Sequence, residues 1–524
     1  MMNEGIRQGT WRVCTAHGIV EGRREKNLYC FRGVPYARAD RFMPPVEYNW
    51  EGVRKAEDFG PAAIQSASRQ AGQREKYGED CLNLNIFVPF GAAESEEEIT
   101  EGESVSQDML SAERQLLPVA VWLHGGAFQN GTSHDRDEKR VVRDHQFIYV
   151  SVEYRLGALG YLYLGEALGE KYRHTGNNGT LDQLAALKWI SENIRAFGGD
   201  PDRITIFGES AGAKSMGALF LHPEMRTFCR QALMGSGAWQ SIRSEETAAC
   251  VTQMFLEEGK KLGYLWKTED ILTLDVDKLL TIQEHVVDNP GNTCMFGPVA
   301  DGAVLPLDWQ ERIERGEYWQ GNVMVGSCLH EMYFTSLQED FVEKAPVIAG
   351  YLFGKNAKLA EADFQAYEKS CVNSGRLPSE KEKTEEWVRI LSDYMYRTYS
   401  RRLAEQLSKS GSRVWYYSFE YGPASHVLDH AMAFDNAAAD DSLFHGQSRM
   451  EREIMASVVY ETFVHFFETG TPGRPGGVEW KPLDEEWSVL AFGEKIHLRP
   501  LTDTETLDGF PQSVFRLMMK RGEN

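Results

Sequence analysis

The segment Ile204-Thr-Ile-Phe-Gly-Glu-Ser-Ala-Gly-Ala213 joins an apolar run to a stretch of small residues. The apolar run predicts a strand, and residues 211–221 predict a helix directly after it. A G-x-S-x-G pattern, from Gly208 to Gly212, stands at their junction. Small residues two before and two after the serine let a strand turn sharply into a helix while Ser210 stays exposed at the tip. The pattern therefore predicts a nucleophilic serine at Ser210, beside the free N–H groups of the following helix.

Apolar runs on either side of this segment predict further strands and helices. The predicted strands are 82–88, 117–123, 147–152 and 414–419, and the predicted helices are 180–197 and 451–468. Strands that alternate with helices at this pitch are typical of the α/β class. We therefore expect a mostly parallel central sheet with helices on both faces.

The chain has 524 residues, of which 42% are hydrophobic, an ordinary globular composition. No linker rich in proline, glycine or serine divides it, so residues 1–524 are expected to form a single domain. Residues 91–111 are rich in glutamate and contain no aromatic side chain, which predicts a solvated acidic loop. Residues from about 245 to 408 have helical patterns with charged faces, which predicts a largely helical insertion.

The net charge argues against several classes of partner. Lys and Arg total 56 and Asp and Glu total 78, which gives −22. An acidic surface repels phosphate backbones and anionic lipids, so nucleic-acid and membrane binding are disfavoured. The first residues lack the pattern of a secretory signal, and no apolar run has the length of a membrane span. The eight cysteines form no C-x-x-C pair, so we expect free thiols and a cytoplasmic location.

A second glycine-rich segment, Val121-Trp-Leu-His-Gly-Gly-Ala-Phe128, directly follows a predicted strand. Backbone without Cβ atoms can direct N–H groups into a pocket, although the same residues could also form an ordinary tight turn. Such a loop, with the N–H of Ala211 after the serine, is suited to bind a developing oxyanion.

These segments and several others resemble the type-B carboxylesterases of the α/β-hydrolase fold. That family includes bacterial p-nitrobenzyl-type esterases and cholinesterases. The resemblance covers most of the chain and implies the α/β-hydrolase fold with helical insertions. The other matching motifs are Phe31-Arg-Gly-Val-Pro-Tyr-Ala37, Arg41-Phe-Met-Pro-Pro45, Gly78-Glu-Asp-Cys-Leu-Asn-Leu-Asn-Ile86, Asn178-Gly-Thr-Leu-Asp-Gln183, Phe197-Gly-Gly-Asp-Pro201, Thr469-Gly-Thr-Pro472 and Trp480-Lys-Pro482.

The resemblance implies a catalytic Ser, Glu and His in that chain order. The acid of this family follows a strand within a G-x-x-x-x-E-G pattern, which Val325-Gly-Ser-Cys-Leu-His-Glu-Met-Tyr-Phe334 matches and which makes Glu331 the acid. The chain departs from the family by having Met332 where glycine is usual. His426, in Gly422-Pro-Ala-Ser-His-Val-Leu-Asp429, matches the loop of the catalytic histidine.

Four other histidines follow Glu331, at positions 430, 445, 465 and 497. His430 is the alternative base, whereas His465 lies within a predicted helix and the other two lie outside any matching motif. The spacing of His426 and His430 is also found in zinc sites, but a third ligand of the usual kind is missing, so no metal is expected.

The resemblance also assigns supporting residues around the predicted nucleophile. It places the oxyanion donors at Gly126, Ala127 and Ala211, where many relatives have glycine at the position of Ala127. Ser236 matches a serine near the triad, and Glu209 is expected to be buried and structural. The substrate pocket should be apolar and aromatic. Its candidate residues are Phe128, Trp239, Phe296, Met332 and Phe334.

The implied activity is hydrolysis of small carboxylic esters, short-chain or aryl, through an acyl-enzyme and without a cofactor. An amide or carbamate hydrolase, or an acyltransferase, could use the same triad. An alternative of another class is a non-catalytic binding protein on the same fold, because fold alone does not decide function. Relatives of that kind lose the nucleophile, whereas this chain has Ser210, Glu331 and His426.

Overall fold

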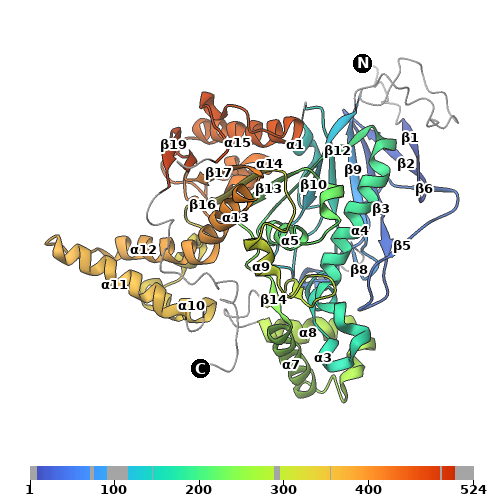
Figure 1. The fold of residues 1–524 in the computed structure, drawn as a ribbon, viewed down its shortest axis with the longest axis horizontal. Helices are drawn as coiled ribbons and strands as arrows, with labels where there is room; N and C mark the ends of the chain where they lie inside the picture. Colours follow the sequence, from blue (N-terminus) through green and yellow to red (C-terminus); the bar gives the residue numbers. More distant parts are fainter. Residues whose placement is uncertain are drawn as a thin grey trace, which may run out of the picture.

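A long mixed sheet runs through the centre of the protein, with the strand order β1-β2-β3-β9-β11-β10-β12-β13-β16-β17-β18-β19 and with β6 beside β2 (Figure 1). The computed structural model describes residues 9–70, 76–90, 116–143, 145–287, 295–353, 356–483 and 487–501. The acidic segment 91–111 predicted as a loop lies outside the described residues.

The strands of the central sheet are β1 (Thr10–Thr15), β2 (Gly18–Glu25), β3 (Leu28–Pro35), β6 (Val53–Lys55), β9 (Asn83–Pro89), β10 (Leu117–Leu123), β11 (Ile148–Val152), β12 (Gly199–Glu209), β13 (Gln231–Gly235), β16 (Asn322–Cys328), β17 (Arg413–Phe419), β18 (Ser488–Phe492) and β19 (Ile496–Pro500). From β11 to β18 along the sheet, neighbouring strands are parallel. β1, β2, β3 and β9 pair in antiparallel fashion, as does the edge strand β19, whereas the short strand β6 pairs with β2 in parallel.

The central strands are apolar on both sides, because both faces of the sheet are covered. In β10, Val119, Val121 and Leu123 belong to the core on one face. Ala120 and Trp122, which alternate with them, belong to the core on the other face. Side chains of a strand point to opposite faces in turn, so a continuous apolar run marks a strand buried between two layers.

The helices are α1 (Glu138–Val142), α2 (Gly157–Tyr161), α3 (Gly165–Leu168), α4 (Asn178–Asn193), α5 (Ala211–Leu219), α6 (Met225–Phe228), α7 (Glu245–Lys261), α8 (Val276–Val287), α9 (Trp309–Glu314), α10 (Phe341–Phe353), α11 (Ala357–Asn373), α12 (Glu380–Ser392), α13 (Thr398–Lys409), α14 (Leu428–Phe434) and α15 (Arg449–Thr469). Helices α4, α5 and α13 share the first core with the sheet, and α1, α14 and α15 share the second. The predicted mostly parallel sheet with helices on both faces is therefore confirmed.

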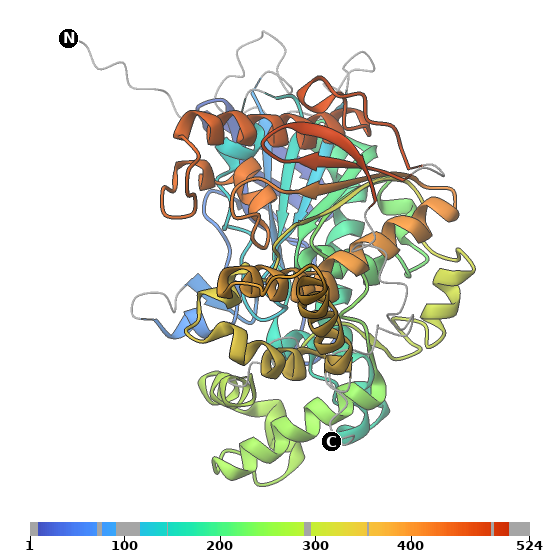
Figure 2. The same ribbon diagram turned by 90° about the vertical axis from the view of Figure 1, so that its left-hand side faces the viewer.

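The helices beyond the sheet lie in two groups. Helices α10, α11 and α12 extend away from the sheet on one side, and α7 and α8 lie together at another corner of the molecule (Figure 1). Turning the view by 90° places the first group in front of the sheet and leaves α15 above it (Figure 2). No helix among the described residues is both long and apolar enough to cross a membrane.

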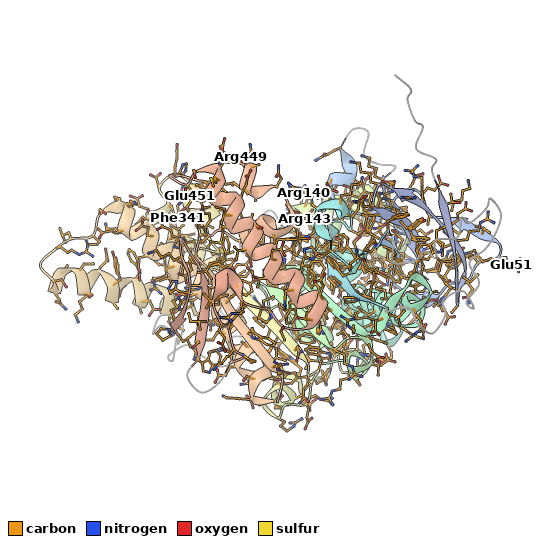
Figure 3. All side chains as sticks on the ribbon, turned by 90° about the horizontal axis from the view of Figure 1, so that it is seen from above. Glu51, Arg140, Arg143, Phe341, Arg449 and Glu451 are labelled. Carbon is orange, nitrogen blue, oxygen red and sulfur yellow. The ribbon has the colours of Figure 1, made fainter. Side chains whose placement is uncertain are left out.

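Helix α15 shows how local sequence sets the ends of an element. Ser448 and Glu451 form a reciprocal capping box at its start, and Gly470 adopts a left-handed conformation, with φ 73°, at its end. A capping box is a standard signal for the start of a helix, and a left-handed glycine is a standard signal for its end. Seen from above, α15 crosses the sheet with Arg140 and Arg143 beside it (Figure 3), and the Arg143 guanidinium lies 3.8 Å from the centre of the Tyr460 ring.

Candidate active site

Ser210 stands at the C-terminal end of β12, where that strand turns into α5. Its backbone has φ 53° and ψ −119°, a conformation that costs a non-glycine residue free energy. A Cβ atom added at Gly212 would lie 2.0 Å from the carbonyl oxygen of Leu123, and one at Gly208 would lie 2.7 Å from the same oxygen. The two glycines of the pattern are therefore needed because β10 passes directly against the turn.

Ser210, His426 and Glu331 form an unbroken chain of hydrogen bonds. The Nε2 atom of His426 lies 2.9 Å from the Ser210 hydroxyl oxygen. Its Nδ1 atom lies 2.5 Å from the Oε2 atom of Glu331. The three residues follow β12, β17 and β16, all at the carboxyl ends of parallel strands, which is where sites of open α/β sheets form.

Glu331 is completely buried and its carboxylate accepts hydrogen bonds from three directions. Besides His426, the donors are the Ser236 hydroxyl at 2.6 Å and the Cys328 N–H at 2.7 Å, both to Oε1. Met332 follows with φ −96°, a conformation open to any residue, so this turn does not need the glycine that is usual in relatives. The Met332 side chain is itself buried.

His426 lies in the loop between β17 and α14. Val427, directly after it, has φ 57°, which is unusual for a β-branched residue. The loop is tied to the acid loop because the His330 N–H donates to the Ala424 carbonyl oxygen at 2.9 Å. The hydrogen bond between the two loops that carry the base and the acid thus helps to maintain the unfavourable backbone conformation of Val427.

The other candidate histidines lie elsewhere. His430 is fully buried with its Nδ1 atom 3.4 Å from Glu209, and burial lowers its pKa to about 4, so it is neutral at neutral pH. His465 is exposed and bonds to the Thr471 carbonyl oxygen. His445 and His497 are also exposed. Among the described histidines, His426 is the one within hydrogen-bonding distance of Ser210.

The segment that carries two of the predicted oxyanion donors passes close to the serine, since a Cβ atom added at Gly125 would lie 3.5 Å from the Ser210 Cβ atom. Gly126 and Ala127 have φ 103° and 55°, and within the described part of the chain neither N–H group has an acceptor. Ala211 begins α5, and the N–H groups of a first helical turn have no intrahelical acceptor. Glycine is required at Gly126, because a Cβ atom there would lie 2.0 Å from the Asn130 carbonyl oxygen.

A buried carboxyl group supports the loop beyond these donors. Oε1 of Glu153 accepts the Ser133 N–H at 2.7 Å, and the Glu153 side chain has no exposed surface. Burial raises its pKa to about 8. Burial also lowers the pKa of neighbouring His134 to about 4. The two side chains, 3.7 Å apart, are therefore both neutral near pH 6 and do not form an ion pair.

This carboxyl group makes stability depend on pH. Between its unfolded pKa near 4.5 and its folded pKa near 8, Glu153 is protonated in the folded chain and ionised in the unfolded one. Stability is therefore lost as pH rises through this window, by on the order of 5 kcal/mol in total. Glu153→Gln stays neutral, so urea unfolding from pH 5 to 9 should show wild type losing stability relative to the variant. Parallel curves would contradict the assignment.

Glu209, beside the nucleophile, takes part in a buried ionic cluster. Its Oε2 atom lies 2.9 Å from Nη2 of Arg136 and 3.4 Å from the indole nitrogen of Trp122. Arg136 also bonds to Asp435 at 3.2 Å. The Glu209 carboxylate is thus held by Trp122 and Arg136, in agreement with the structural role predicted for it.

The predicted pocket residues differ in exposure. Phe128, Trp239, Phe296 and Met332 are buried, whereas the Phe334 side chain is 52% exposed. Sequence reasoning missed Tyr396, whose ring centre lies 4.4 Å from that of His426. No motif marks this tyrosine, because it lies within the helical stretch that carries no recognisable signature.

One cluster of possible metal ligands occurs among the described residues, formed by Glu25, Cys30 and Glu138. Arg32 lies among them and bonds to both carboxylates, at 2.6 and 2.8 Å. The guanidinium already compensates the two negative charges, so the arrangement is that of an ion-pair network.

The model of the carboxylesterase family matches residues 10–507. The chain belongs to the carboxylesterase family. It is therefore a carboxylic ester hydrolase of the α/β-hydrolase fold, as the sequence motifs predicted.

Several carboxylesterases resemble it along nearly their whole length. The para-nitrobenzyl esterase of Bacillus subtilis is 28% identical over 499 residues, which cover 90% of this chain and 93% of the relative. Liver carboxylesterase 1 of Oryctolagus cuniculus is 26% identical, with 92% of this chain and 89% of the relative covered. Among solved structures, the Geobacillus stearothermophilus carboxylesterase EST55 superposes with a TM-score of 0.76 at 29% identity, covering 93% of this chain and 97% of the other.

Proposed function

We propose that this carboxylesterase hydrolyses short-chain or aryl esters in two steps through an acyl-enzyme on Ser210. The observation that carries the proposal is the continuous hydrogen-bonded chain from Ser210 through His426 to Glu331, at 2.9 and 2.5 Å. The name of one relative, para-nitrobenzyl esterase, supports the aryl part of the proposal.

In the first step, the Ser210 oxygen attacks the ester carbonyl while His426 Nε2 takes its proton. Glu331 holds the imidazole through Nδ1 and stabilises the imidazolium that forms. The carbonyl oxygen becomes an oxyanion, which in this proposal accepts hydrogen bonds from the N–H groups of Gly126, Ala127 and Ala211. The C–O bond of the ester then breaks, and His426 gives the proton to the departing alcohol.

In the second step, a water molecule attacks the acyl-enzyme. His426 removes a proton from this water, and the resulting tetrahedral centre occupies the same group of N–H donors. Its collapse releases the carboxylic acid and returns the proton to the Ser210 oxygen. Atoms and charge balance without a cofactor, because water is the only second reactant.

A p-nitrophenyl alkylphosphonate tests this assignment directly. The reagent should release one equivalent of p-nitrophenol per chain and leave its phosphonyl group on the peptide that contains Ser210, which mass spectrometry would identify. Labelling on another residue would refute the proposed nucleophile. Rates with p-nitrophenyl acetate, butyrate, octanoate and palmitate would then measure the depth of the acyl pocket, and the shorter esters should be preferred.

We further propose that the enzyme works in the cytoplasm, without nucleic-acid or membrane partners. The cysteines at 14, 30, 81, 229, 250, 328 and 371 are free thiols, a state that reducing compartments maintain. The net charge of −22 supports the absence of polyanionic partners.

A further inference from the structure

The ring of Tyr396 covers the imidazole of His426. The two ring centres are 4.4 Å apart with an angle of 38° between their planes, and Tyr396 is buried. Tyr396 belongs to a π-helical turn, η10 (Asp393–Arg397), which lies between α12 and α13. A π-helical turn is rare and is frequently found at functional sites.

The same ring has a second charged neighbour, on the helix that follows the nucleophile. Lys214 lies one turn after Ser210 in α5, and its Nζ atom is 4.8 Å from the centre of the Tyr396 ring. The Lys214 side chain is buried. A cation at this distance from an aromatic ring is attracted to it, and the attraction is stronger away from water. Lys214 therefore helps to fix the position of the tyrosine.

Helix α12, which leads directly into the π-helical turn, is attached to the acid loop. The Met332 N–H, next to Glu331 in the chain, donates to the Ser392 hydroxyl at 3.0 Å. Asp393 begins the turn and bonds to Arg389 at 2.7 Å and to Arg397 at 2.5 Å. The buried Asp393 carboxylate therefore bonds to two guanidinium groups, one before and one after it in the chain, and these bonds stabilise the turn. The continuous segment α12–η10 thus contacts Met332, next to the acid, through Ser392 and the base His426 through Tyr396.

We propose that Tyr396 is a positioning residue for His426. The ring keeps the imidazole in the orientation that points Nε2 at Ser210 and Nδ1 at Glu331, and its face stabilises the imidazolium of the transition state. This inference rests on the proposed function, since it assigns Tyr396 a role through the catalytic histidine. A tyrosine that only filled space would have no effect on the protonation of His426.

The pH profile is a readout that packing alone would not change. The charged groups around the two rings are Glu331, which bonds to the imidazole, Lys214 from α5, which lies against the tyrosine ring, and Arg397, which follows Tyr396 in η10. Tyr396→Leu removes the aromatic face beside the imidazole and changes none of these charged residues. The acid limb of kcat/KM should therefore move to lower pH, by about 0.5 unit, because the protonated imidazole loses a favourable contact.

The experiment compares Tyr396→Leu with Tyr396→Phe and wild type. We expect kcat to fall about 10- to 100-fold in Tyr396→Leu with KM little changed, because a misplaced base slows chemistry more than binding. Tyr396→Phe keeps the ring and should retain most of the wild-type kcat. Wild-type kcat and an unmoved acid limb in Tyr396→Leu would overturn the proposal.

Tyr394→Leu provides a matched control from the same turn. Tyr394 is also buried, but its hydroxyl donates to Asp363 at 2.6 Å and its ring neighbours Phe353 rather than His426. Its replacement should leave the acid limb of kcat/KM unmoved. An equal shift in both variants would assign the effect to the helix and overturn the role of Tyr396.

Titration with the p-nitrophenyl phosphonate separates this inference from the proposed function. All rates are divided by the number of sites that the reagent labels, so that a loss of folded protein in a variant does not appear as a loss of kcat. If Tyr396→Leu does not fold, Lys214→Met removes the cation that fixes the ring and should lower kcat about 3- to 10-fold. If wild type itself fails to label at Ser210, the proposed function is wrong, whereas labelling with unchanged kcat in both variants contradicts only the inference.

Discussion

Replacing Ser210 by alanine should lower kcat for p-nitrophenyl butyrate by roughly 10⁴- to 10⁶-fold. The change removes the oxygen that attacks the carbonyl and to which His426 Nε2 is bonded at 2.9 Å. No acyl-enzyme can then form, and only the oxyanion donors and substrate binding would continue to accelerate direct attack by water. Steady-state rates and phosphonate labelling, measured together, would test both consequences.

Ser215→Ala is the matched control for this variant. Ser215 is a fully buried serine in the same helix, and its hydroxyl accepts a hydrogen bond from Gln183 at 3.0 Å instead of facing the substrate. We expect kcat within a few-fold of wild type for Ser215→Ala. Comparable activity in Ser210→Ala and wild type would remove Ser210 from the mechanism.

The central elements could be predicted from the sequence where an apolar pattern or local capping residues mark them. The run 117–123 is apolar at every position except its proline, and it forms β10, which is buried between two helical layers. The predicted helix 451–468 corresponds to α15 because its capping serine and terminating glycine are encoded locally. The start of β12 at Gly199 was not predictable in this way, because there the backbone pairs with Leu117, which is distant in sequence.

The candidate site was predictable where a motif fixes local backbone geometry. Ser210 and Gly126 both adopt backbone conformations that require the small residues around them, so the pattern itself carries the information. The contact between Tyr396 and His426 depends instead on how η10 packs against the loop after β17. Such a distance arises only when the whole chain is folded, and no spacing along the sequence encodes it.

The choice between His426 and His430 shows the same limit. The two residues are four positions apart, and residue type alone does not separate them. In the structure, His430 packs against Gly235, where a Cβ atom would lie 2.5 Å from its Nε2 atom. Gly235, in the neighbouring strand β13, therefore leaves space for the neutral His430 side chain, whereas His426 bonds to Ser210.

Replacing Glu331 by glutamine should lower kcat by ~10⁴-fold while the chain stays folded. Glutamine can keep an oxygen toward the Ser236 hydroxyl and the Cys328 N–H, which now donate to Oε1 at 2.6 and 2.7 Å. Its NH₂ group would then face Nδ1 of His426, which must become an acceptor. The proton of the neutral imidazole moves to Nε2, where it blocks removal of the Ser210 proton.

Asp429→Asn tests whether any buried carboxylate of this region would have the same effect. Asp429 is equally buried and lies three residues after His426, but it accepts a hydrogen bond from the Tyr417 hydroxyl at 2.6 Å. Its replacement should change stability more than kcat per labelled site, because the imidazole tautomer is set by Glu331. Both variants would be measured by phosphonate titration and by urea unfolding. A large loss in Asp429→Asn with a small one in Glu331→Gln would transfer the role of the acid to Asp429.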